Sequence, residues 1–215
     1  LTSDDIYHLS KLAIMEYLTS GITANADMYL TPDTMIQASE DCGFRTTVIG
    51  AVNDFTQSVK EVENWYEKYH KEDGLTSYEL GFHAEYTTKR EILEGISELS
   101  KKYHAPIYTH NSESASEVAQ CVERTGMTPT VYMEQLGLFE YGGGLYHCVH
   151  MSEEDLDVVK RHQISVITNP ASNLKLASGI APIEEMLKRN IDLAIGTDGP
   201  ARNNCLDTVS YTHLR

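Results

Sequence analysis

Apolar and polar positions along this chain alternate between a helical period and short, strand-like apolar runs. Residues 3–19 place apolar side chains near helical spacing, which predicts an amphipathic helix. GITANADMY follows as a predicted strand that ends at Asp27. Thr31 and Pro32 open a second predicted helix that stops near Gly43, and FRTTVIGAV is typical of a β-branched strand. The residues spaced helically in the first segment are Ile6, Leu9, Leu12, Ala13 and Leu18.

The same alternation continues through the middle of the chain. We predict a helix at about residues 59–70 and a strand at about 78–83. Thr88 with Glu91 resembles a capping box ahead of the helix EILEGISELSKKY. APIYTH and GLYHCVH are predicted strands, and SASEVAQCVERTG between them is a predicted helix. Ser152 is the predicted N-cap of the helix SEEDLDVVKRHQ.

Two segments leave alternatives open. NPASNLKL, residues 169–176, has no helix pattern and follows the strand ISVITN, so it is either an ordinary hydrogen-bonded loop or a wall of an active site. Residues 127–139 contain TVYMEQLGLF, predicted as an extra helix that either covers the site or simply packs. The helix APIEEMLKRN and the strand IDLAIGTD complete the pattern.

Seven short apolar strands alternating with helices predict an α/β fold with a parallel sheet covered on both faces. A doubly wound sheet and a (β/α)8 barrel both fit this order. His83, His110, His147 and Asp198 each lie at or just beyond the carboxyl end of a different predicted strand. A barrel gathers such ends around one mouth, so we favour a partial (β/α)8 barrel from which one strand is missing.

Composition narrows the function classes. The 215 residues carry 32 acidic and 17 basic side chains, a formal net charge of −15, which disfavours nucleic acid and anionic membranes as partners. No apolar run approaches the roughly 20 residues of a membrane span. The four cysteines form no CxxC pair, which indicates free thiols in a reducing, cytoplasmic compartment. We expect a small-molecule substrate and leave open a homo-oligomer.

The polar residues at the strand ends suggest metal chemistry. Asp198 lies between two glycines in GTDG, and a lone motif of this kind is as well explained by a helix cap. Together with His110 and His147 it favours a metal, because imidazole and carboxylate groups suit zinc or ferrous iron at open sites. In HCVH, residues three apart face opposite sides of a strand, so His147 is the better candidate and His150 is expected to make a loop contact.

THNSES, HCVHMSEED, NPASNLKLASGIAPI and GTDGPARNN together resemble the metal-dependent amidohydrolase superfamily. The similarity is strongest to its 5-methylthioadenosine/S-adenosylhomocysteine deaminase branch, which includes chlorohydrolase and guanine-deaminase relatives. It extends over nearly the whole chain and is densest from Tyr108 to Asn204. The resemblance implies an amidohydrolase barrel and a hydrolase acting on C–N bonds, with zinc as the expected metal and iron as the alternative.

The resemblance also implies a role for each matched residue. His110 corresponds to a metal ligand, and Asp198 to a residue that is both metal ligand and general base. Glu113 corresponds to a glutamate that contacts the substrate and moves protons, and His147 to a histidine that orients the attacking water. His83, in GFHAEY, corresponds to a substrate-contacting histidine. We also expect Asn173, in NPASNLKL, to bind substrate.

Several features depart from the family pattern. No His-x-His pair is present, so we expect that the chain starts after strand one and that residues 1–207 form an incomplete barrel. TVSYTHLR does not resemble the expected continuation, and we treat residues 208–215 as a tail of doubtful origin in which His213 has no role. The only arginine along FRTTVIGAVND is Arg45, at the start of its strand, which favours a neutral substrate over one with a carboxylate.

Three functions therefore stay in view. The first is deamination of a purine nucleoside such as 5-methylthioadenosine, S-adenosylhomocysteine or adenosine by a metal-activated water. The second is an aminohydrolase or chlorohydrolase acting on guanine or an s-triazine ring. The third is a catalytically inactive fragment, which the missing His-x-His pair favours.

Overall fold

The computed structural model describes residues 1–199, and the predicted boundary at 207, the tail and His213 lie outside that part. Strands and helices alternate in it as the sequence predicts. The strands are β1 (Ala24–Met28), β2 (Arg45–Ile49), β3 (Thr76–Ala84), β4 (Ile107–Asn111), β5 (Gly143–His147), β6 (Ser165–Thr168) and β7 (Leu193–Ile195). The helices are α1 (Ser3–Thr19), α2 (Pro32–Cys42), α3 (Val59–Tyr69), α4 (Arg90–Tyr103), α5 (Ala115–Thr125), α6 (Pro129–Gln135), α7 (Glu153–Arg161), α8 (Pro170–Lys175) and α9 (Ile183–Lys188), with a 3-10 turn η1 (Glu85–Thr87).

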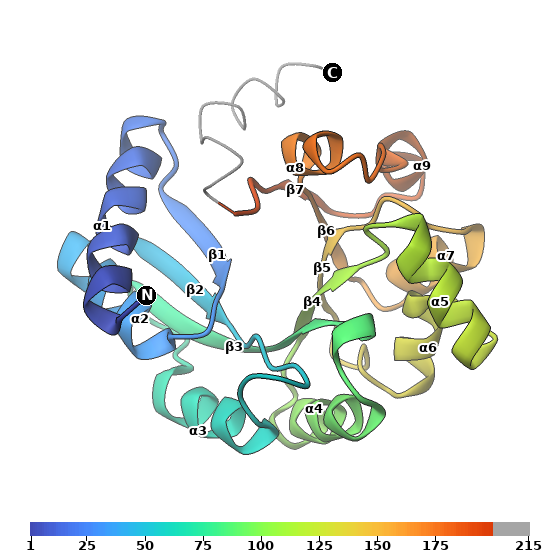
Figure 1. Cartoon of the computed structure of the whole chain (residues 1–215), viewed down its shortest axis with the longest axis horizontal. Coiled ribbons are helices and arrows are strands. Elements are labelled where there is room, and N and C mark those ends of the chain that lie inside the picture. Colours follow the sequence, from blue (N-terminus) through green and yellow to red (C-terminus); the bar gives the residue numbers. More distant parts are fainter. Residues whose placement is uncertain (200–215) are drawn as a thin grey trace.

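The seven strands form one parallel sheet in chain order, from β1 to β7. Figure 1 shows the sheet curved into an open arc with helices around its outer side and with β1 and β7 at the two ends. Each connection from one strand to the next contains helix, as parallel neighbours require. The predicted partial (β/α)8 barrel is therefore confirmed, with seven strands in the described residues.

The main core lies between the sheet and the outer helices. Val48, Leu145 and Val166 are all 0% exposed and belong to one cluster with apolar residues of α3, α4 and α7. Because side chains alternate along a strand, the intervening residues face the inside of the arc. His110 of β4 and Tyr146 of β5 are paired in register on that inner side. The strand pattern thus separates a packing face from a face that carries polar chemistry.

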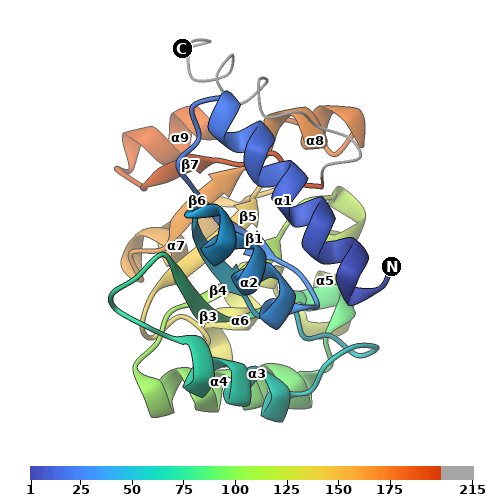
Figure 2. The same ribbon diagram turned by 90° about the vertical axis from the view of Figure 1, so that its left-hand side faces the viewer.

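Helix α1 is confirmed, but the face it buries is narrower than the spacing predicts. Ile6 and Ile14 are buried, whereas Leu9, Leu12 and Leu18 are 49–58% exposed. The helix lies at the β1 end of the sheet, where it packs mainly on α2 (Figure 2). A helix at the end of the arc contacts fewer elements than one in the middle, so its second apolar side stays in solvent.

Local sequence signals predict one of two capped helix starts correctly. Ser152 caps α7 in a capping box with Asp155, as predicted. The capping box predicted for Thr88 and Glu91 is wrong, because Lys89 is the N-cap of α4 and has no side-chain capping bond. The Lys89 amide, free at a helix start, donates instead to Asp54 Oδ1 at 2.7 Å. A long-range contact thus replaces the local cap.

The two ambiguous segments are also resolved. NPASNLKL is not a loop, because Pro170–Lys175 form the short helix α8 with proline at its first turn, where the missing N–H is not needed. The predicted helix in residues 127–139 exists as α6, but it packs against α5 and α7 on the outer side of the sheet. Met133, Leu138 and Phe139 are buried in the main core there, so α6 does not cover the inner mouth.

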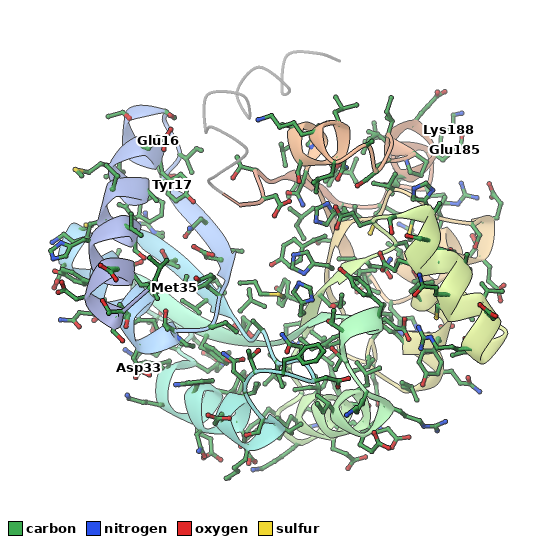
Figure 3. The ribbon with its side chains drawn as sticks, viewed as in Figure 1. Glu16, Tyr17, Asp33, Met35, Glu185 and Lys188 are labelled. Carbon is green, nitrogen blue, oxygen red and sulfur yellow. The ribbon has the colours of Figure 1, made fainter. Side chains whose placement is uncertain are left out.

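Side chains on the outer helices face solvent or neighbouring helices. Glu185 and Lys188 of α9 form a surface ion pair at 2.9 Å (Figure 3). Tyr17 of α1 and Met35 of α2 line a small cavity beside β1 (Figure 3). None of the helices in residues 1–199 is both long enough and apolar enough to cross a membrane.

Candidate active site at the carboxyl ends of the strands

Three histidines meet at the carboxyl ends of adjacent strands. The ring centroids of His83 and His110 are 5.0 Å apart, and those of His110 and His147 are 5.5 Å apart. The register pairs His147 with Asn111, so an unbroken strand would turn its side chain away from His110. Left-handed backbone at His147 and Cys148, with φ of 69° and 50°, breaks the pleat there. This local break brings the third imidazole to the inner face.

Hydrogen bonds give all three rings the same tautomer. His110 Nδ1 donates to the His83 carbonyl oxygen at 2.7 Å, and His147 Nδ1 donates to Asn173 Oδ1 at 2.8 Å. His83 Nδ1 lies 2.8 Å from Thr87 Oγ1, which itself donates to the Ala84 carbonyl and therefore accepts from the ring. With each Nδ1 donating, each Nε2 keeps its lone pair. The three rings can thus act as acceptors or metal ligands at Nε2.

Glu113 lies opposite His147 across the mouth. Its Oε2 is 3.8 Å from His147 Nε2, and its Oε1 accepts from Ser178 Oγ at 3.3 Å. The Glu113 side chain is 22% exposed, so water and small ligands reach it. The predicted loop contact of His150 is confirmed, because His150 Nε2 donates to the Ser178 carbonyl oxygen at 2.7 Å. That bond holds the segment carrying Ser178 against the Glu113 side.

The buried carboxylate of Glu117 holds the turn that carries Glu113. It accepts backbone N–H groups from Ser112, Glu113 and Ser114 at 2.9, 2.9 and 3.4 Å. Ser114 completes a capping box by accepting from the Glu117 amide. Burial raises the pKa of Glu117, and these N–H groups oppose that rise. Glu117 was missed by the sequence analysis, although the Ser-x-x-Glu spacing of a capping box was a usable signal.

Asp198 follows β7 and lies beside α8. Its Oδ2 accepts a short hydrogen bond from Ser172 Oγ, and its Oδ1 accepts from the Gly199 amide at 2.7 Å. The Asp198 backbone is left-handed, with φ of 59°. Ser172 is fully buried, so a rigid donor fixes one end of an otherwise exposed carboxylate. Sequence reasoning missed Ser172, whose only signal was its place in NPASN.

The NPASN segment supports the mouth from behind. Asn173 is 1% exposed and uses its carbonyl oxygen on His147. Asn169 is also buried and its Nδ2 lies 3.4 Å from His147 Nε2. Two asparagines from one short segment therefore contact both nitrogens of the same ring. Of the two alternatives left open for NPASNLKL, this geometry supports a wall of the site.

Electrostatics keep the central imidazole neutral. The pKa of His110 is lowered to about 4, mainly by burial and also by the neighbouring His147 and His83, while the His83 carbonyl and Asp198 oppose the shift. Burial also lowers the pKa of His83, and Glu113 opposes that change. A neutral His110 presents its Nε2 lone pair without first losing a proton.

The imidazole and carboxylate groups at this mouth are of the kinds that bind zinc or iron. The described residues, however, contain too few of them to complete a metal site. His110 offers Nε2 and is oriented by a carbonyl through Nδ1, the usual arrangement for a metal-binding histidine. Asp198 offers carboxylate oxygens. Within residues 1–199, no three His, Cys, Asp or Glu side chains converge to hold one ion. The described residues therefore supply a partial ligand set.

Comparison with known proteins places this geometry in context. The chain is 38% identical over 223 residues to a 5-methylthioadenosine/S-adenosylhomocysteine deaminase of Caldanaerobacter subterraneus, a match covering 100% of this chain and 51% of the relative. It is 36% identical over 207 residues to a 5'-deoxyadenosine deaminase of Methanococcus maripaludis, covering 93% and 49%. The chain thus spans about half the length of the curated relatives it matches.

Solved structures agree on the fold. An adenosine deaminase from Xanthomonas campestris with bound zinc superposes with a TM-score of 0.91 at 30% identity, covering 98% of this chain and 49% of that one. A guanine deaminase from C. acetobutylicum with bound guanine gives a TM-score of 0.87 at 22% identity, covering 98% and 55%, a likeness that shows the fold alone. The amidohydrolase family model matches residues 1–213. This chain belongs to the amidohydrolase family.

Proposed function

We propose that this protein takes part in the metal-dependent hydrolytic deamination of a purine nucleoside such as 5-methylthioadenosine, S-adenosylhomocysteine or adenosine. The observation that carries the proposal is the arrangement of His83, His110 and His147, all with Nε2 lone pairs, around a mouth that also contains Glu113. Relatives at 36–38% identity that are named as deaminases of adenosine derivatives support it. So does the zinc-bound adenosine deaminase at 30% identity.

Zinc is the proposed metal, with iron as the alternative, and His110 and Asp198 would contribute two of its ligands. When bound, such an ion lowers the pKa of a coordinated water from about 15.7 to roughly 7, which supplies a nucleophile at neutral pH. Two ligands do not complete a zinc site. Within residues 1–199, no three His, Cys, Asp or Glu side chains lie close enough together to hold one ion. His147 is not proposed as a ligand.

The chain's own side chains would then manage the protons. Asp198 is the proposed general base, with Ser172 holding one of its oxygens in place. Glu113 is the proposed proton carrier between the water, the ring nitrogen next to the reacting carbon and the departing ammonia. His147 would orient the attacking water through Nε2, since its Nδ1 is committed to Asn173. His83 would contact the nucleoside.

The sequence led to the expectation that Asn173 binds substrate, and we now propose a different role for it. The side chain is 1% exposed and its carbonyl oxygen is used by His147. We propose that Asn173 positions His147 and acts on the substrate only through that ring. Removing its carbonyl would free the imidazole to rotate.

A neutral nucleoside is the preferred substrate within this class. Arg45 is the first residue of β2, and the carboxyl ends of the strands form the mouth, so Arg45 lies at the opposite end of the strand. A substrate carboxylate would therefore find no arginine from β2. This supports adenosine or 5-methylthioadenosine over S-adenosylhomocysteine.

The test is ammonia release from zinc-supplied protein with adenosine, 5-methylthioadenosine, S-adenosylhomocysteine, guanine and s-triazines as separate substrates. Faster release from the neutral adenosine derivatives supports the proposal. Preference for guanine or triazines would support the second function named above. Absence of both turnover and nucleoside-induced shifts in the amide spectrum would support an inactive chain.

The cysteines and the net charge of this protein support proposals about its compartment and its partners. Cys121 and Cys148 are buried free thiols and Cys42 is a partly exposed one, which supports a reducing compartment such as the cytoplasm. A small molecule is the proposed partner, and the acidic charge supports neither nucleic acid nor membrane as a ligand. Self-association into a homo-oligomer is proposed without assigning its interface.

A further inference from the structure

We propose that Arg124 is a positioning residue for His110. Its ion pair with Glu85 fixes the carboxyl end of β3, and the His83 carbonyl at that end fixes the orientation of the His110 ring. The inference rests on the proposed function, because it explains how a proposed metal ligand is held. Neither Arg124 nor Glu85 carried a sequence signal.

The pair joins α5 to the turn after β3. Arg124 Nη1 donates to Glu85 Oε1 at 3.0 Å and Nη2 donates to Oε2 at 2.8 Å. This bidentate pair fixes the orientation of the Glu85 carboxylate as well as its distance from the guanidinium group. Glu85 is 2% exposed, whereas the Arg124 side chain is 51% exposed. A buried carboxylate that loses its cationic partner must move to reach water or take up a proton. The turn therefore depends on Arg124 to keep Glu85 where it is.

The connection from Glu85 to His110 is short. Glu85 is the second residue after His83, and it begins the turn η1. The His83 carbonyl oxygen accepts from His110 Nδ1 at 2.7 Å and from Thr109 Oγ1 at 3.2 Å. A rotation of the peptide planes near Glu85 therefore displaces the acceptor of His110. Without that acceptor, nothing fixes the proton on Nδ1, and Nε2 is no longer reserved as a lone pair.

Helix α5 also holds the next turn through Glu117, so one helix sets both the Glu113 turn and the His83 turn. Glu117 lies in its first turn and Arg124 in its last. The positions of Glu113 and His83 relative to each other are thereby set by a single helix. A two-point ion pair at this place fixes the orientation of Glu85, which apolar packing alone would not do.

A control pair separates positioning from simple stabilisation. Arg161 of α7 donates to Glu134 Oε1 through Nη2 at 2.6 Å and through Nε at 3.1 Å. Its side chain is 56% exposed, close to the value for Arg124. Glu134 lies on α6, outside the sheet and away from the mouth. Arg161→Met therefore removes an arginine–carboxylate contact without touching β3, and Glu134 keeps its 2.8 Å contact with His162 Nε2.

The experiment uses the chain with ¹⁵N-labelled histidine, without metal or nucleoside, at a pH where the imidazoles are neutral. Wild type should show His110 as a single Nδ1–H tautomer. Arg124→Met should shift both ring nitrogens toward tautomer-averaged values and remove the slowly exchanging Nδ1–H signal. Arg124→Lys should restore the signal in large part, and Arg161→Met should leave it unchanged.

Should Arg124→Met fail to fold, the double variant Glu85→Gln/Arg124→Met removes the unpaired buried charge together with the clamp and is expected to show the same averaging. A folded single or double variant in which His110 keeps one Nδ1–H tautomer would overturn the proposal. Because neither metal nor substrate is present, this result is independent of the ammonia assay. Failure of the deaminase proposal would appear in that assay alone.

Discussion

His147 of β5 and Asn173 of α8 are joined by a 2.8 Å hydrogen bond from the imidazole Nδ1 to the amide Oδ1, and both side chains are 1% exposed. The bond links the end of β5 to α8 through two residues that are 26 positions apart in the chain. A buried donor and a buried acceptor satisfy each other here. Each would be unsatisfied without the other.

Replacing Asn173 should therefore weaken the fold as well as the site. Asn173→Ala leaves the buried His147 N–H without an acceptor, which is expected to lower the free energy of unfolding by about 1–3 kcal/mol. Urea-induced unfolding measures the change. Asn64→Ala, at an exposed position in α3, is the matched control and should change the stability little. Equal stability of the two variants would contradict the role assigned to Asn173.

Glu117→Gln should loosen the Glu113 turn. The amide can keep only part of the contacts to Ser112, Glu113 and Ser114, because its NH₂ group faces N–H donors. We expect a loss of about 1–3 kcal/mol in the free energy of unfolding. Hydrogen exchange at the amides of residues 112–114 should also accelerate. Glu123→Gln, exposed on the same helix, should change neither. Unchanged exchange at these amides would show that another contact holds the turn.

Glu113→Gln tests the proposed proton carrier directly. Gln keeps the size of the side chain and loses its ability to exchange protons, so turnover should fall by about 10²–10⁴-fold. Ammonia release measures this fall, and metal content and thermal unfolding should match those of wild type. Normal turnover in this variant would remove Glu113 from the mechanism.

Zinc binding tests the partial ligand set. Residues 1–199 contain no group of three His, Cys, Asp or Glu side chains that could hold one ion. We therefore expect metal analysis of the purified 215-residue chain, after dialysis against free zinc and then buffer, to find well below one ion per chain. His110→Ala should reduce even this amount. Tight zinc at one ion per chain would show that this account of the ligands is wrong.

Asp27 should make stability depend on pH. It faces the small cavity beside Tyr17 and Met35, and burial raises its pKa from 3.8 to about 6. The folded state thus holds a proton that the unfolded state releases above its lower pKa. Stability contributed by protonated Asp27 is fully present below pH 3.8 and is lost as the pH rises through about 6.

The measurement is the free energy of unfolding between these two pH values. Asp27→Asn should remove this part of the slope and should be more stable than wild type above the upper value. Asp73→Asn, at an exposed position, should keep the slope of wild type. A wild-type slope that survives in Asp27→Asn would assign the pH dependence to another group.

The fold followed from the sequence because strands and helices left strong periodic signals. The apolar runs around Val48, Leu145 and Val166 predicted buried strands, and each is fully buried. His83, His110 and His147 could be grouped in advance because a barrel gathers strand ends. Asp198 was grouped with them for the same reason, whereas the family resemblance added Glu113, which the residues alone did not distinguish from a surface carboxylate.

Other features depended on contacts that no local pattern encodes. Arg124 and Glu85 are 39 positions apart, and tertiary packing brings the end of α5 to the turn η1 that carries Glu85. Lys89 replaced Thr88 at the start of α4 because Asp54, 35 positions away, supplied an acceptor. The short helix α8 lacks the length at which periodicity can be recognised. In each case tertiary packing decided between locally similar outcomes.

The left-handed backbone at Ser112, His147, Cys148 and Asp198 affects how this protein responds to selection for heat tolerance. Side chains other than glycine raise the energy of that conformation, by about 1–2 kcal/mol per residue. Random libraries screened only for survival at high temperature should thus recover glycine at the exposed Asp198, whereas at the buried Ser112, His147 and Cys148 the lost packing and hydrogen bonds would offset the gain. Such a variant would melt later and would lack the proposed general base, which would mark the mouth as the region where durability and chemistry compete.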